Sequence, residues 1–348
     1  MIRLAWLQAR TQTLATLAGV AALAVLLVLT GSNLTHLYNT LIAPCTANGD
    51  CPPTTVHAFL NNYGGLRNAL DLLVLFVPAL LGIFWGAPMV AHEFEAGTFR
   101  LAWTQSVTRT RWLAIKLGVT LVLTMLVAGA LSLMVTWWAH PFDRVREDAF
   151  TYFEQRDIAP IGYAAFGFVL GVTAGVLIRR TLPAMVTVLV VFTAARVAMN
   201  HWVRYRLIAP RHIIAALDPD STGYGRRGSG PASLDPSPPH LPNAWVYSTR
   251  IVDNAGHGLT NEVLTSTCPQ LSIDGGPRPL GSGTPQKAPT DIRDALQNCV
   301  SAVGKQYHTL ITYQPANRYW TFQWYELGIY LGAAAVVAGA CVWMIHRR

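Results

Sequence analysis

The sequence is poor in charged residues, which make up 13% of its 348 residues, whereas apolar residues make up 52%. A soluble globular domain usually carries about 25% charged residues. The charged residues are also unevenly distributed, because long stretches of the sequence contain none. A charge at the centre of a bilayer costs several kcal/mol, so uncharged stretches are typical of membrane-spanning helices. The composition therefore argues against a soluble domain and for a membrane protein.

Motifs for nucleotide and metal chemistry are missing as well. The P-loop pattern G-x-x-x-x-G-K-[ST] does not occur, and the nearest fragments, 281–283 and 304–306, lack it. His92 and Glu93 begin a HExxH zinc pattern, but Ala96 stands where the second histidine would be. No CxxC motif occurs either. We therefore expect no metal site, no catalytic residues and no ATPase site in this chain.

Long apolar stretches predict a polytopic membrane protein of the all-α class. A membrane-spanning helix needs about 20 mainly apolar residues. Six stretches qualify, at 14–30, 70–91, 113–138, 161–178, 182–202 and 324–345. The first can be read instead as a signal peptide, but no clean cleavage pattern follows Thr30, which favours a retained anchor. Residues 1–12 mix apolar and basic side chains, and we expect an interfacial helix there.

Basic residues in the short connections predict the orientation. With six spans, both termini fall on one side, together with the larger set of basic residues: Arg3, Arg10, Arg100, Arg109, Arg111, Lys116, Arg179, Arg180, Arg347 and Arg348. The smaller set falls on the other side: Arg67, Arg144, Arg146 and Arg156. Short cytoplasmic loops are enriched in Lys and Arg. Both termini are therefore predicted to be cytoplasmic.

The cysteines agree with this orientation, because they fall in pairs on the predicted outer side. Cys45 and Cys51 lie in the first outer connection, and Cys268 and Cys299 lie in a long outer segment. Disulfides persist outside the cytoplasm. We predict the bonds Cys45–Cys51 and Cys268–Cys299, with Cys341 in the last span left free.

Residues 203–321 form an insert that is long enough for a small domain of its own. Within it, 244–252 and 309–313 are predicted strands, and 290–303 is a predicted helix with apolar residues on one face. The Gly-, Pro- and Ser-rich stretch 218–242 is predicted to be a flexible loop. The expected architecture is a membrane domain over 1–202, an extracellular α/β insert over 203–321, and the last span with a cytoplasmic tail over 322–348.

Small residues at four-residue spacing predict close helix packing. Gly167, Gly171 and Gly175 lie on one face of the fourth span, and Gly82 and Gly86 lie in the second. Such faces let two backbones approach closely. Packing within the chain is favoured over a dimer interface.

The connection between the second and third spans, 92–112, is the most informative segment. Two carboxylates, Glu93 and Glu95, precede a Gly97-Thr98 pair that can end one helix and start another. The rest combines aromatic, polar and basic residues: Arg100, Trp103, Thr104, Arg109 and Arg111. A solvated connector with basic side chains at the membrane surface is the simpler alternative.

This pattern resembles the type-2 membrane permeases of ATP-binding-cassette (ABC) exporters, in a bacterial branch. The resemblance rests on Glu93-x-Glu95-x-Gly97-Thr98 followed by Thr104, Arg109 and Lys116, and on the stretch from Gln314 to Glu326 that leads into the last span. It implies that 92–112 is a coupling region that docks on a separate ATPase subunit. The long insert departs from the family.

The resemblance also implies partners and a location. It implies ATP and Mg on partner ABC ATPase subunits, a second permease subunit that is identical or related, and contact with membrane lipid. The location would be the bacterial plasma membrane. Two other classes stay open: a membrane sensor whose insert binds a ligand, and an intramembrane enzyme. Nucleic acid is not an expected partner, because no nucleic-acid-binding motif occurs.

One charge, Arg196, lies inside the fifth predicted span, and Asp71 and Glu326 lie at a similar depth on other spans. An intramembrane charge usually faces a partner or a cavity. We expect an ion pair of Arg196 with Asp71 or with Glu326. Contact with an anionic substrate and extension of the side chain to the membrane surface are the alternatives. The acidic residues of 143–157 alternate with Arg144, Arg146 and Arg156, and that segment is interpreted as a solvated surface.

Overall fold

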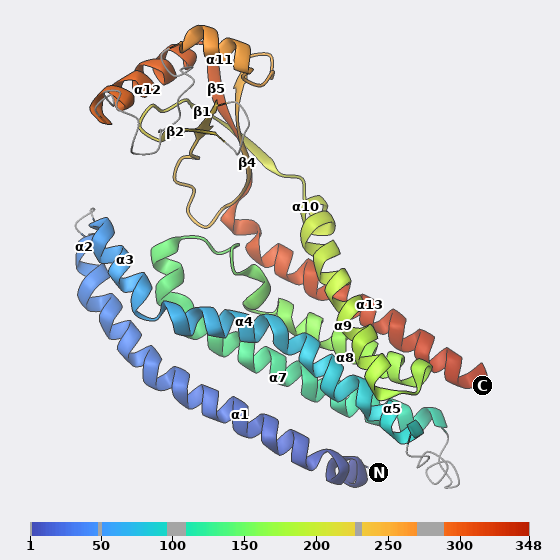
Figure 1. The fold of residues 1–348 in the computed structure, drawn as a ribbon. Helices are drawn as coiled ribbons and strands as arrows, with labels where there is room; N and C mark the ends of the chain where they lie inside the picture. Colours follow the sequence, from blue (N-terminus) through green and yellow to red (C-terminus); the bar gives the residue numbers. More distant parts are fainter. Residues whose placement is uncertain (1, 48–50, 96–108, 227–231, 270–288, 348) are drawn as a thin grey trace, which may run out of the picture. The chain divides into compact units, whose positions relative to one another are not determined.

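The computed structural model describes residues 2–47, 51–95, 109–226, 232–269 and 289–347 (Figure 1). The chain forms two compact units. One is the membrane unit, made of Met1–Ile208 and Arg318–Arg348, and the other is the insert unit, Ala209–Asn317. The expected boundaries of the insert, 203 and 321, fall inside helices of the membrane unit.

In the described part of the chain, six helical segments are long and apolar enough to cross a membrane, as predicted. They run over Leu14–Thr46, Gly64–Ala91, Leu117–Arg146, Ala159–Ile178, Thr181–Leu207 and Ala316–Met344. Most are longer than expected. Helix α7 (Arg109–Arg146) has 38 residues. At 1.5 Å per residue it is about 57 Å long, well beyond a hydrocarbon core of about 30 Å. Its ends therefore reach the polar layers.

Several spans join more than one helical element. The first contains α1 (Ile2–Leu37), the π-helical turn η1 (Tyr38–Ile42) and α2 (Ala43–Ala47), and α3 (Pro53–Asn62) follows it. The second contains α4 (Gly64–Leu81), η2 (Gly82–Gly86) and α5 (Ala87–Glu95). The fifth contains α9 (Thr181–Ala198), η4 (Met199–Val203) and α10 (Arg204–Leu207). Further helical elements are η3 (Phe153–Gln155), α8 (Ala159–Ile178), η5 (Ala316–Arg318) and α13 (Tyr319–Arg347).

The N-terminal residues continue directly into the first span. The backbone of Ile2–Leu37 is one helix, so no break separates the expected interfacial helix from the span. Residues 2–18 contain no Gly or Pro, and Leu, Ala, Gln and Arg are good helix formers. A position in the membrane surface for residues 1–12 stays a prediction.

Helix α8 is the centre of the membrane unit and packs against α4, α5, α7, α9 and α13. Its predicted glycine face is confirmed as a packing surface within the chain. A Cβ on Gly175 would lie 2.7 Å from the carbonyl oxygen of Ala87, and one on Gly86 would lie 2.6 Å from that of Phe168. Real Cβ atoms do not approach so closely, so only glycine fits at these positions.

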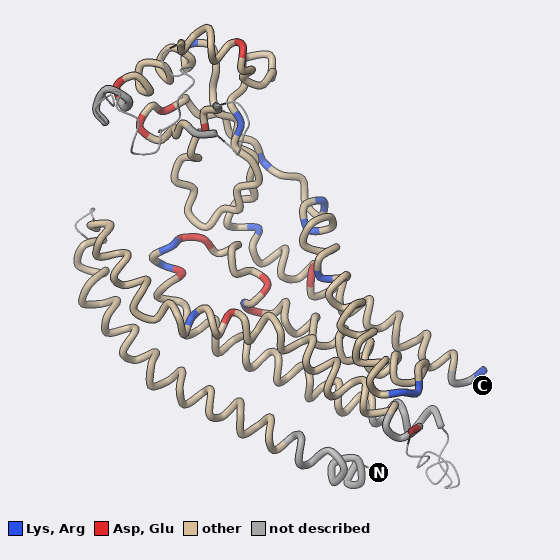
Figure 2. The backbone as a smooth tube through the Cα atoms, in the orientation of Figure 1, with Lys and Arg blue, Asp and Glu red and all other residues tan. Residues whose placement is uncertain are grey.

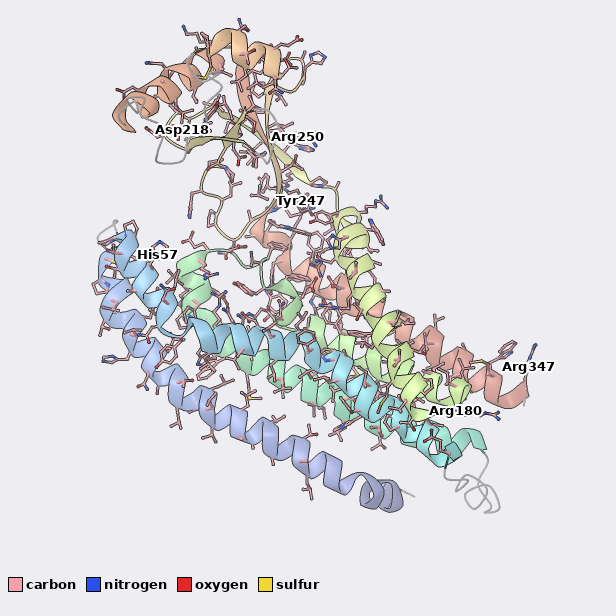
Figure 3. All side chains as sticks on the ribbon, in the orientation of Figure 1. His57, Arg180, Asp218, Tyr247, Arg250 and Arg347 are labelled. Carbon is pink, nitrogen blue, oxygen red and sulfur yellow. A yellow bond between two sulfur atoms is a disulfide. The ribbon has the colours of Figure 1, made fainter. Side chains whose placement is uncertain are left out.

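Both chain ends lie at the same end of the membrane unit (Figure 1). The end of α5 and the link between α8 and α9 lie there too. Figure 3 shows Arg180 and Arg347 at this end and His57 of α3 at the opposite end.

The insert unit has a three-stranded antiparallel sheet in the order β1 (Arg211–Ala216), β5 (Tyr307–Gln314), β4 (Trp245–Asp253). Its helices are α11 (Asn261–Thr267) and α12 (Pro289–Val303). Both predicted strands and the predicted helix are confirmed. Its core contains Leu217, Leu234, Ile251, Leu264, Val300 and Val303. The labelled side chains Asp218, Tyr247 and Arg250 belong to this unit (Figure 3).

The expected flexible loop over 218–242 is wrong for 222–226 and 232–236. Its residues include β2 (Thr222–Arg226) and β3 (Ala232–Pro236), which pair antiparallel. Leu234 is 8% exposed and belongs to the core of the insert. Backbone pairing and one buried leucine hold this segment, although its Gly- and Ser-rich composition favours turns.

Both predicted cysteine pairs are disulfide-bonded, and the described Cys341 is free and buried. The Cα–Cα distance is 4.8 Å for Cys45–Cys51 and 5.3 Å for Cys268–Cys299. Both distances lie in the range that a disulfide spans, about 4.4–6.8 Å. The first bond joins the end of α2 to the start of the α3 segment, and the second ties α11 to α12.

Candidate functional site

Four charged side chains, each from a different helical element, meet inside the membrane unit. Glu154 comes from η3 between α7 and α8, Arg196 from α9, Arg204 from α10, and Glu326 from α13. We call them the four-charge cluster. Glu326 is 0% exposed and Arg204 is 5% exposed. Figure 2 shows that charged residues gather around the α7–α8 connection, whereas the helices are uncharged along most of their length.

Short ion pairs hold the cluster together. Arg196 Nη2 lies 2.5 Å from Glu154 Oε2, and Arg204 Nη2 lies 2.8 Å from Glu154 Oε1. Arg204 also donates to both carboxylate oxygens of Glu326, from Nε at 2.9 Å and from Nη2 at 2.8 Å. Arg196 Nη1 lies 3.8 Å from Glu326 Oε1. Two guanidinium groups thus face two carboxylates, which keeps the buried group neutral overall.

Aromatic and amide groups complete the surroundings of the cluster. The hydroxyl of Tyr163 on α8 donates to Glu326 Oε1 at 2.5 Å, and the guanidinium of Arg196 lies 3.6 Å from the centre of the Tyr163 ring. Arg204 Nη1 donates to Asn200 Oδ1 at 3.0 Å. Each buried charge needs such partners, because an unsatisfied one costs several kcal/mol. The cluster therefore also ties α8 to α9, α10 and α13.

The π-helical turn η4 brings the two arginines onto one face. In an unbroken α-helix, residues eight apart lie about 80° apart around the axis. A π-helical turn takes up one additional residue, so Arg196 and Arg204 are related as residues seven apart, about 20° around the axis. Because η4 (Met199–Val203) separates them, both guanidinium groups can reach Glu154 and Glu326.

A second charged group, Arg67, Asp71 and Arg156, lies beside the same connection. Arg156 Nη2 lies 3.1 Å from Asp71 Oδ1, and Arg67 Nε lies 3.8 Å from Asp71 Oδ2. The guanidinium of Arg67 stacks 4.1 Å from the centre of the Tyr152 ring. Arg156 Nη1 donates to the carbonyl of Val135 at 2.9 Å. Residues 152–156 therefore contribute to both buried charged groups.

Polar side chains of α13 fix this connection in place. Gln323 accepts from the backbone N–H of Ala159 at 2.9 Å and donates to the carbonyl of Phe153 at 3.1 Å. The hydroxyl of Tyr319 donates to Asp157 Oδ2 at 2.6 Å. Gln323 is 0% exposed. The connection between α7 and α8 is thus built into the membrane unit.

The structure confirms one of the two expected partners of Arg196 and corrects the other. Arg196 reaches Glu326, but Asp71 pairs with Arg156 and Arg67. The interpretation of 143–157 as a solvated surface is wrong for Glu154 and Arg156, since Arg156 is 3% exposed. Alternating charges in a sequence do not tell a solvated surface from a buried network.

Sequence reasoning missed Arg204, because it assigned this residue to the insert. The signal was present, since Arg196, Asn200 and Arg204 follow one another at four-residue spacing. That spacing places polar residues near one helix face. Extending the fifth predicted span, 182–202, by two residues would have included Arg204.

At the opposite end of α9, the carboxylate of Glu95 caps the N-terminus of the helix. Its Oε1 accepts from the backbone N–H of Thr181 at 2.9 Å, and its Oε2 accepts from the Thr181 hydroxyl at 2.8 Å. The first N–H groups of a helix have no partner within it, and a carboxylate there also interacts with the helix dipole. Glu95 therefore links the end of α5 to the start of α9.

The other residues expected to couple to an ATPase are only partly described. Glu93 lies in α5, and Arg109 and Arg111 lie in the first turn of α7. Gly97, Thr98, Arg100, Trp103 and Thr104 lie outside the described residues.

The described residues form six apolar helices of membrane-spanning length, with paired charges buried between them. This arrangement is typical of a multi-pass membrane protein. A sequence model described as "ABC-2 membrane transporter related" matches residues 17–204, more than half of the chain. The chain belongs to this family and is a membrane permease of an ABC system. The family points to a transport subunit and implies association with ABC ATPase components.

The matched range ends at Arg204, so it holds three members of the four-charge cluster and omits the insert. No curated protein and no solved structure gives a match to the chain.

Proposed function

We propose that the chain is the permease subunit of an ABC exporter in a bacterial plasma membrane. Two permease subunits, identical or related, form the translocation pathway and associate with two ATPase subunits, which bind ATP and Mg. The segment 92–112 docks on the ATPase. Family membership supports the permease role, and the motif Glu93-x-Glu95-x-Gly97-Thr98 supports the docking role.

One observation carries the proposed coupling: the bond between Glu95 and Thr181. Glu95 is the last residue of α5 and lies within the docking segment 92–112. Thr181 begins the fifth span, which runs to Leu207 and carries Arg196 and Arg204. A displacement of the docking segment would thus reach α9 directly. At 1.5 Å per residue, this span of 27 residues extends about 40 Å.

The experiment is co-expression with the ATPase and purification of the complex in detergent. Glu95→Ala and Gly97→Val should insert into the membrane but lower ATP hydrolysis by the complex. Arg250→Ala in the insert is the control and should leave assembly and hydrolysis unchanged. Changing Glu93 and Glu95 together without loss of ATPase binding or hydrolysis would reduce the segment to a plain connector.

The proposed orientation places both termini, the α8–α9 link and the docking segment in the cytoplasm, with the insert outside. It is supported by the basic residues of the short connections and by the cysteine pairs. Single cysteines at His57 and Arg180 test it, since these residues lie at opposite ends of the membrane unit (Figure 3). A membrane-impermeant maleimide added to intact cells should label His57→Cys and not Arg180→Cys. The reverse result would invert the orientation.

A further inference from the structure

A cavity of about 360 Å³ opens between the first and third spans. Thr35, Tyr38 and Asn39 line it from α1 and η1, and Trp137, His140 and Arg144 line it from α7. Small-molecule sites in proteins typically have volumes of about 300–1,000 Å³. The cavity is thus large enough for the polar part of a lipid or for a comparable ligand.

The walls of the cavity are fixed by direct contacts between α1 and α7. The indole N–H of Trp138 donates to the hydroxyl of Thr30 at 2.9 Å. A Cβ on Gly31 would lie 3.2 Å from ring atoms of both Trp137 and Trp138, so a larger residue there would press against the two indoles. The two helices therefore touch at Gly31, and the cavity begins where that contact ends.

The lining of the cavity selects for an anion. Arg144 is exposed, and within the described residues it makes no ion pair or hydrogen bond. Arg67, Arg156 and Arg204 are buried, Arg196 is partly buried, and all four face carboxylates. His140, Tyr38, Asn39 and Thr35 add polar groups, and no Asp or Glu is among the lining residues. A guanidinium with hydroxyl and amide neighbours is suited to the oxygens of a phosphate.

The position of the cavity points to a ligand that is partly in the membrane. Arg144 lies two residues before the end of the third span, Leu117–Arg146. Below it, Leu126, Leu133 and Trp137 follow one face of α7 at helical spacing, and all three are more than half exposed. Trp and Tyr are typical of the membrane–water interface. An apolar track thus leads from the bilayer interior to a cationic cavity at its edge.

We propose that this cavity binds the phosphodiester headgroup of a membrane phospholipid, with Arg144 holding the phosphate. The acyl chains lie along Leu133 and Leu126 of α7. This site is separate from the proposed ATPase docking segment and does not depend on the exporter role.

Native mass spectrometry of the purified, delipidated full chain tests the proposal. Dioleoyl phosphatidylglycerol is compared with dioleoylglycerol, which has the same acyl chains and no phosphate. The wild-type chain should retain the phospholipid and not dioleoylglycerol. Arg144→Gln should weaken phospholipid binding about tenfold, the effect of losing one charge-assisted contact. Arg206→Gln, an exposed arginine at the end of the fifth span, is the matched control and should bind normally.

A second variant keeps the test informative if Arg144→Gln is poorly produced. Thr35→Phe fills the cavity from α1 and leaves Arg144 in place, and it should also weaken phospholipid binding. Equal binding by wild type and both variants would overturn the proposal, and so would equal binding of dioleoylglycerol. Competition by millimolar inorganic phosphate alone would show a site for a small free anion and would overturn the assignment to a lipid.

Discussion

The two ends of the fifth span are held in different ways. At one end, Arg196 and Arg204 are enclosed with Glu154 and Glu326, and Glu326 is fully buried. At the other end, the exposed side chain of Glu95 caps the helix start at Thr181. Buried pairs are costly to break, whereas an exposed cap is worth about 0.5–2 kcal/mol. The span is therefore firmly anchored beside the α7–α8 connection and lightly held beside the proposed docking segment.

Neutralising one buried charge should produce the largest effect. Glu326→Gln leaves Arg204 and Arg196 facing a single carboxylate, and the free energy of unfolding should fall by about 3–5 kcal/mol. Thermal unfolding in detergent measures the loss. Glu262→Gln, an exposed glutamate of the insert, is the control and should stay close to wild type.

A double variant separates charge imbalance from lost packing. Arg204→Met with Glu326→Met removes one charge of each sign and leaves the Arg196–Glu154 pair intact. Most of the stability lost in Glu326→Gln should return, because well-packed apolar side chains often replace a buried pair without loss. A double variant less stable than Glu326→Gln would contradict this account.

Removing one hydroxyl from the cluster should have an intermediate effect. Tyr163→Phe keeps the ring beneath Arg196 but deletes the donor to Glu326 Oε1. Leaving one buried acceptor short of a donor costs about 1–3 kcal/mol. Tyr325→Phe, next to Glu326 on α13, is the matched control, since Tyr325 is 50% exposed. Equal melting temperatures for the two variants would mean that the hydroxyl adds nothing to the cluster.

Breaking the exposed cap should have the smallest effect on stability. Thr181→Val removes the hydroxyl that donates to Glu95 and keeps the backbone N–H bond. In a double-mutant cycle with Glu95→Ala, the coupling energy should be about 0.5–1 kcal/mol. A coupling energy of about 3–5 kcal/mol, as large as the loss expected for the buried cluster, would contradict the proposed difference between the two ends of the span.

The six spans could be predicted because length and lack of charge decide whether a helix crosses a bilayer. The glycine face of α8 could be predicted because only backbone contact requires such spacing. The partners of Arg196 could be narrowed only to two candidates. Glu154 reaches the cluster through the path of the α7–α8 connection, which Gln323 and Tyr319 fix from a distant part of the sequence. No local pattern encodes that path.

In the insert, too, some elements could be predicted from the sequence and others could not. Apolar periodicity identified β4, β5 and α12, whose inward faces build the core of the insert. The pairing of β2 with β3 was not predicted, because Gly, Ser and Pro dominate that stretch and Leu234 is the one apolar residue that its described part adds to the core cluster. Burial of a single leucine depends on elements that come later in the chain.

The glycine face of α8 has a mechanical consequence. Along Gly167, Gly171 and Gly175, main-chain atoms of α8 lie directly against main-chain atoms of α4, η2 and α5. Side-chain interfaces can switch between alternative rotamer packings, whereas a contact between bare backbones has no such second arrangement. We therefore expect these helices to move as one rigid body. Any rearrangement of the bundle would then take place at the helix interfaces that are packed through side chains.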